Sequence, residues 1–154
     1  MPADFKFVHC ADLHLGSRFR GISESDPELG KKLFQAPFLS FRKIVDLALS
    51  ERADFMVISG DVFDEENESP RVRYTFCEEL KRLDMPCFIA LGNHDFRRSW
   101  ESSIPFPDNV HVFSSDPDRQ TVRAGKVPVE IIGRSFSSRH TEENFAASLR
   151  GNKH

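Results

Sequence analysis

Three short apolar segments alternate with two longer segments of helical spacing, and this order constrains the fold more than any other feature of the chain. Residues 54–59 and 87–91 are predicted to be strands, because each is short, mostly apolar and followed by glycine. Residues 5–10 are predicted to be a strand because bulky and polar residues alternate before a polar cluster. Residues 34–53 and 70–84 are predicted to be helices, since their apolar side chains recur every three or four positions. This order predicts an α/β fold in which helices flank a mainly parallel sheet.

Prolines and capping residues set the expected limits of the helices. Ser69 followed by Pro70 is typical of an N-cap and a first helical residue. Pro37 is expected near the first turn of its helix, because a proline in the middle removes a backbone hydrogen bond. Thr141 is the expected N-cap of a last helix that ends at Leu149. Three further short strands are predicted at residues 110–113, 121–123 and 127–132.

Size and composition predict one soluble domain over residues 1–154. No apolar run approaches the roughly 20 residues that a membrane span needs, so we expect no contact with a membrane. The absence of a secretion signal and three cysteines without metal-type spacing predict reduced thiols in a cytoplasmic protein. The formal net charge of -3 neither favours nor excludes DNA as a partner.

Polar side chains directly follow each of the first three predicted strands. They are Asp12 and His14 after the first strand, Asp61 after the second, and Asn93 and His94 after the third. Because ligands bind outside the carboxyl ends of parallel strands, we expect these five side chains to converge at one edge of the sheet. Asp12 and His14 are two positions apart, so an extended segment would direct both to the same side.

The side chains of this group are of the kinds that bind divalent cations. Carboxylate, amide and imidazole donors without thiolate favour manganese, with magnesium, iron or zinc as alternatives. Asp61 follows a glycine that allows a tight turn, and its two oxygens can bridge two metals. A pair of metals roughly 3.5–4 Å apart supports hydrolysis of phosphate esters. His94 is the candidate for protonating the leaving oxygen or stabilising the charge that develops on the phosphoryl group.

The motifs DLHLG, GDVFD and GNHD resemble those of the calcineurin-like metallophosphoesterases, and in particular those of the SbcD-like DNA-repair nucleases. The resemblance covers about residues 5–149 and implies the first half of a two-sheet sandwich. It implies that Asp12 and His14 bind a first metal and that Asp61 bridges two. It also implies that Asn93 binds the second metal and that His94 is catalytic. The implied reaction is manganese-dependent cleavage of DNA during repair, with an SbcC-like ATPase as partner.

Members of this family also supply further histidines from later motifs, and residues 1–154 hold neither motif. We therefore expect these residues to be the N-terminal portion of the domain, with an incomplete second metal site and weak or no activity alone. His111, His140 and His154 lack the sequence setting of the missing motifs. A sandwich that is incomplete would expose a sheet edge and an apolar face, which favours a homodimer.

The roles of several residues stay open at this point, as does the substrate. Asp64 and Asp95 either orient ligands or solvate a loop. Arg18 and Arg97 either contact DNA phosphates or are ordinary solvated arginines, and His9 is expected to be packed within its strand. One rival function is a phosphoesterase acting on nucleotides or phosphoproteins, because a dimetal centre serves many substrates. The other is a truncated fragment without catalytic activity.

Overall fold

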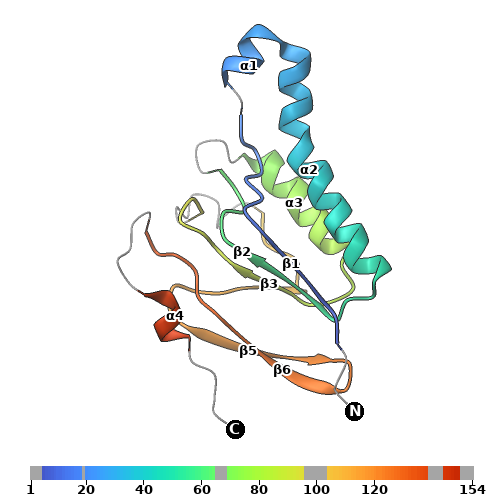
Figure 1. Ribbon diagram of the computed structural model, residues 1–154, viewed down its shortest axis with the longest axis vertical. Coiled ribbons are helices and arrows are strands. Elements are labelled where there is room, and N and C mark those ends of the chain that lie inside the picture. The colour runs from blue at the N-terminus through green and yellow to red at the C-terminus, as the bar shows by residue number, and fades with distance from the viewer. Residues whose placement is uncertain (1–4, 19, 65–68, 96–103, 139–143, 150–154) are drawn as a thin grey trace.

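The computed structural model describes residues 5–18, 20–64, 69–95, 104–138 and 144–149, and it shows an α/β fold built around a parallel sheet (Figure 1). The elements are β1 (Phe7–Ala11), α1 (Arg20–Ser25), α2 (Pro27–Ser50), β2 (Phe55–Ser59), α3 (Pro70–Lys81), β3 (Cys87–Ala90), β4 (Val110–Val112), β5 (Asp118–Ala124), β6 (Val127–Gly133) and α4 (Phe145–Ser148). The predicted fold class is confirmed.

The main sheet has the strand order β1-β2-β3-β4, and every neighbouring pair is parallel. Its register aligns Ala11 with Ser59, and Ser59 with Ala90. The last residues of β1, β2 and β3 therefore lie side by side at the carboxyl end of the strands. The polar segments that follow these strands all start from that end.

The two faces of the main sheet pack against different partners (Figure 1). On one face α2 and α3 cover the larger core, in which Phe41 and Phe76 of the helices pack with Met56, Ile58 and Ile89 of the strands. On the other face the antiparallel hairpin of β5 and β6 covers a smaller core. This smaller core contains Phe55, Phe88, Phe113, Val122 and Ala124.

Two polar side chains join the hairpin to the main sheet at its opposite ends. The Asp54 carboxylate accepts hydrogen bonds from the backbone N–H groups of Lys6 at 2.9 Å and Gly125 at 2.7 Å. The buried Ser135 hydroxyl donates to the carbonyl of Phe113 and accepts from the N–H of Leu91 at 2.9 Å. These bonds fix the hairpin relative to the segments that begin and end the parallel strands.

Part of the sheet face beside the hairpin carries exposed aromatic side chains. Phe5 and Phe7 are 38% and 52% exposed. The ring of Phe7 stacks on that of Phe55 with centroids 5.2 Å apart. This row belongs to β1 and the residues before it, and β1 is an edge strand of the described sheet.

The long helix α2 differs from its prediction at its beginning. It begins at Pro27, where the Asp26 carboxylate accepts a hydrogen bond from the N–H of Leu29, and not near Phe34. Pro37 therefore lies inside the helix, so its predicted place near the first turn is wrong. The capping residue Asp26 and Pro27 at the first helical position set the beginning of the helix upstream of Pro37.

The other helices agree with expectation to different degrees. In α3, Ser69 is the N-cap as predicted, and the helix ends at Lys81, a few residues earlier than expected. In α4 the N-cap is Asn144, whereas the predicted Thr141 lies outside the described residues. The short α1 was not predicted. Among the described residues, no helix combines the length and apolar character that a bilayer span requires.

The C-terminal end of α2 closes with a Schellman motif that has an arginine in the position usually held by glycine. Arg52 has a φ of 51° and donates its N–H to the carbonyl of Leu49 at 3.1 Å, while Ala53 donates to Ala48 at 3.0 Å. Ala53 and Ala48 are both buried, so the motif turns the chain directly from α2 into β2. The left-handed conformation of Arg52 is strained because its Cβ approaches the backbone.

We predict that Arg52→Gly raises the free energy of unfolding by about 0.5–1 kcal/mol, because relief of left-handed strain exceeds the entropy cost of glycine. Urea unfolding followed by circular dichroism measures the change. Arg52→Ala is the control, since it keeps the Cβ atom and should leave the free energy within about 0.5 kcal/mol. A glycine variant less stable than the alanine variant would show that this turn is not strained.

Candidate metal centre

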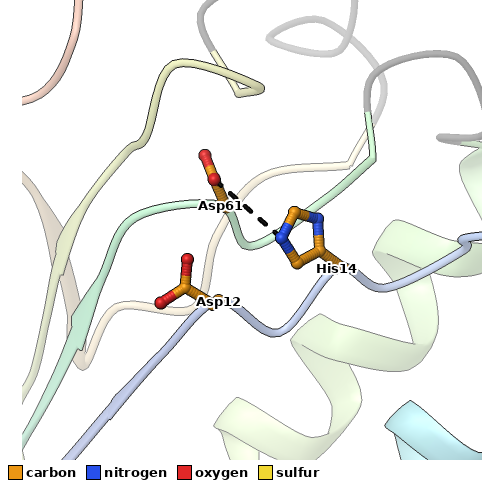
Figure 2. Close-up of side chains that lie close together, drawn as sticks. All are labelled: Asp12, His14 and Asp61. Atoms are coloured by element: carbon orange, nitrogen blue, oxygen red, sulfur yellow. Dashed lines mark ion pairs between the residues drawn. The ribbon is translucent and has the colours of Figure 1, made fainter.

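Three side chains from the ends of β1 and β2 form a cluster of metal-binding donors. One ligand atom from each of Asp12, His14 and Asp61 lies within 4.8 Å of the others. Figure 2 shows the three side chains around a common space, with His14 Nε2 3.9 Å from Asp61 Oδ2. Ligands on opposite sides of one divalent ion are about 4–5 Å apart, so this donor set fits a single cation.

The backbone at all three positions is left-handed, and this conformation was not expected. Asp12, His14 and Asp61 have φ values of 52°, 45° and 42°. The side chains therefore converge because the chain twists after Ala11, not because the segment stays extended. Residues other than glycine adopt this conformation at an energetic cost, which is found most often at functional sites.

Backbone hydrogen bonds between the two segments hold them in this conformation. Asp12 donates to Gly60 at 3.2 Å, and His14 donates to Asp61 at 2.9 Å. A bridge between Leu15 and Phe63 continues the pairing beyond the strands. The segments after β1 and β2 therefore stay side by side while their side chains turn toward the candidate site.

The segment after β3 brings His94 to the same place. The N–H of His94 donates to Asp61 Oδ1 at 3.2 Å, and the rings of His94 and His14 have centroids 5.8 Å apart. Gly92 allows this approach, because a Cβ atom at that position would overlap the carboxylate and the backbone nitrogen of Asp61. Asn93 lies between Gly92 and His94 in the same turn and is partly exposed.

The buried carboxylate of Asp95 connects the second and third segments. It accepts hydrogen bonds from the N–H groups of Val62 at 2.9 Å, Phe63 at 2.8 Å and Gly92 at 2.9 Å. Burial raises the pKa of Asp95 above its usual value, and the three hydrogen bonds oppose this rise. Asp95 is 3% exposed, so its carboxylate positions two backbone segments and does not solvate a loop.

The remaining candidates lie at the rim of the site or outside the described residues. Asp64 accepts a hydrogen bond from the hydroxyl of Ser17 at 3.1 Å, which joins the first and second segments. Arg18 directly follows Ser17 and is exposed, whereas Arg97 lies outside the described residues. Sequence reasoning missed Ser17, and no pattern in the sequence singles it out.

Two other histidines have partners of their own. His9 is exposed, and its Nε2 lies 2.6 Å from the Ser59 hydroxyl, so the expectation of a packed histidine is wrong. His9 pairs with Val57, which packs in the smaller core, so residue 9 lies on the hairpin side of the sheet, in the edge strand β1. His111 pairs with Asp118 at 2.9 Å and contacts the ring of Phe113. His140 and His154 lie outside the described residues.

The three cysteines are free thiols, with Cys77 and Cys87 buried and Cys10 partly buried. Burial raises the pKa of Cys10 to about 11, and it also raises the pKa of Cys77 and Cys87. None of the three is among the described donors of the cluster. Among the residues that the structure describes, the centre therefore offers oxygen and nitrogen donors.

Comparisons with known proteins identify the family of this chain and several relatives. The sequence profile of the calcineurin-like phosphoesterases matches residues 5–149. The chain is 34% identical over 155 residues to the metallophosphoesterase YhaO of Bacillus subtilis (strain 168), covering 97% of this chain and 38% of YhaO. It is 32% identical over 106 residues to the DNA double-strand break repair protein Mre11 of Methanococcus maripaludis, covering 66% of this chain and 26% of that protein.

A second Mre11, from Archaeoglobus fulgidus, is 34% identical over 93 residues, which cover 58% of this chain and 19% of that protein. The chain thus spans well under half the length of these relatives. The family profile nevertheless covers nearly all of its residues, including every residue of the candidate centre. The chain belongs to the calcineurin-like phosphoesterase family.

Proposed function

We propose that this protein hydrolyses phosphodiester bonds in DNA with the help of two divalent cations. The observation that carries the proposal is the convergence of Asp12, His14 and Asp61 on one small space, with the His94 ring beside it. The family binds divalent metals and its activity is that of a hydrolase. The relatives named for double-strand break repair support DNA as the substrate.

In this proposal each residue has a distinct task. Asp12 and His14 would hold a first cation, Asp61 would serve two cations, and Asn93 would offer an amide oxygen to the second. Two cations bound here would supply an activated water and would neutralise charge on the phosphate. His94 donates a proton to the leaving oxygen, and its backbone bond to Asp61 keeps the imidazole close to the cluster.

The proposal extends to features that the sequence resemblance implies. Oxygen and nitrogen donors without thiolate favour manganese over softer metals. We also propose that the protein acts with an SbcC-like ATPase partner, forms a homodimer and is located in the cytoplasm. Because the chain spans 38% of the length of YhaO, the second cation site and full activity would draw on residues beyond those of the cluster.

The test offers purified protein with manganese three substrates, namely linear duplex DNA, a mononucleotide and a phosphoserine peptide. We expect release of nucleotides from DNA that is weak for residues 1–154 alone, because their second cation site is incomplete, and that stops when the metal is chelated. Hydrolysis of the mononucleotide or the peptide while DNA stays intact would favour the rival substrates. Cleavage of DNA that persists in chelator would contradict a metal-dependent mechanism.

We predict that Asp61→Asn abolishes metal-dependent hydrolysis, because a neutral amide cannot hold two dications as a carboxylate does. His94→Ala should slow turnover by roughly 10²–10⁴-fold while metal content stays nearly unchanged. Calorimetric titration with manganese and initial rates on duplex DNA measure both effects. The exposed Asp116→Asn is the matched control and should change neither. Loss of metal from the His94 variant would make that residue a ligand.

We predict that Asp95→Asn weakens manganese binding by roughly 10–100-fold, because an amide cannot accept all three backbone hydrogen bonds that hold the two segments together. It should also lower the free energy of unfolding by about 1–3 kcal/mol. Asp54→Asn is the matched control, since Asp54 likewise accepts two backbone N–H groups, at the other end of the sheet.

The Asp54 variant should lose stability without losing manganese affinity. Titration calorimetry and urea unfolding on both variants separate the two effects. Equal losses of affinity in the two variants would show that Asp95 acts only through overall stability.

A further inference from the structure

A groove adjoins the candidate metal centre on the side of α2. It has a volume of about 360 Å³, which is within the range of about 300–1,000 Å³ typical of small-molecule sites. The lining residues are Asp12, Leu13, Leu33, Ala36, Pro37 and Ser40. Asp12 belongs to both the groove and the donor cluster, so the two are continuous. Figure 1 shows α2 passing beside the segment that follows β1.

The wall that α2 contributes contains the unexpected proline of that helix. Pro37 has no N–H group, so the carbonyl oxygen of Leu33 receives no helical hydrogen bond from residue 37. Leu33 and Pro37 both line the groove. A proline inside a helix is costly, and here it leaves a hydrogen-bond acceptor on the turn of α2 that borders the groove.

We infer that this groove binds the nucleoside attached to the phosphate that the donor cluster holds. The inference rests on the proposed function and names the part of the substrate that α2 contacts. Leu13, Leu33 and Pro37 provide apolar surface for the faces of a base. The carbonyl of Leu33 and the hydroxyl of Ser40 provide polar atoms for the N–H groups at its edge.

The shared position of Asp12 explains why a nucleoside suits the groove better than an unrelated apolar ligand. A phosphate held at the cluster places its own sugar and base next to Asp12, where the groove begins. An apolar ligand without a phosphate would have no link to the cluster and would leave the polar atoms of the groove without partners. Binding through both parts makes the nucleoside a determinant of substrate affinity.

The test compares two probes in the presence of manganese, deoxyadenosine monophosphate and methyl phosphate, by titration calorimetry. Wild-type protein should bind the nucleotide at least about tenfold more tightly than methyl phosphate. Ala36→Phe, which fills the groove, should reduce this ratio of affinities by roughly tenfold. Gln35→Phe adds the same side chain at an exposed neighbouring position outside the groove and should leave the ratio unchanged.

A second variant separates binding from folding. Pro37→Ala restores the N–H group that can bond to the carbonyl of Leu33, so it should raise the unfolding midpoint while reducing the ratio of affinities. Loss of nucleotide binding in a more stable protein cannot result from misfolding.

The inference is overturned if wild-type protein binds both probes equally, or if Ala36→Phe and Gln35→Phe behave alike. Failure of the proposed function gives a different result, because nucleotide would still bind at the groove while duplex DNA remained uncleaved.

Discussion

The parallel register of β1, β2 and β3 is the constraint on which the rest of this structure depends. Because Ala11, Ser59 and Ala90 are aligned, the three segments that follow start from one line at the edge of the sheet. A shift of one residue in either pair would turn the buried side chains of a strand to the opposite face. The same register therefore determines both the core under α2 and α3 and the grouping of Asp12, His14 and Asp61.

The candidate centre combines backbone strain with compensating hydrogen bonds. Left-handed conformations at Asp12, His14 and Asp61 cost about 1–2 kcal/mol each. The bonds from the Asp95 carboxylate to buried backbone N–H groups, and those between the first two segments, offset this cost. Gly92 removes the side chain that would otherwise separate the second and third segments. These hydrogen bonds hold the donors in place, which favours binding by reducing the entropy lost.

Much of the fold follows from the sequence, since short apolar segments ending in polar residues predict parallel strands that share an edge. The grouping of Asp12 with Asp61 follows from the same pattern. The beginning of α2 at Pro27 differs from the prediction, because a proline is expected in the first turn of a helix and Pro37 lies inside this one. The left-handed backbone at Asp12 and His14 depends on bonds to Gly60 and Asp61 after β2, and Asp95 depends on bonds to Val62 and Phe63 of another segment. The local sequence pattern around a residue does not indicate such contacts between distant segments.

The donors of the cluster come from segments that are distant along the chain, and this distance has a consequence for folding. The hydrogen bonds from Val62 to Asp95 and from Ser17 to Asp64 join residues 33 and 47 positions apart. Such contacts form only after long loops have closed, and parallel pairing is intrinsically slow. An unfolded chain therefore presents no assembled binding site. A cation that binds only the native state shifts the folding equilibrium by mass action, so metal supply and protein abundance become linked in the cell.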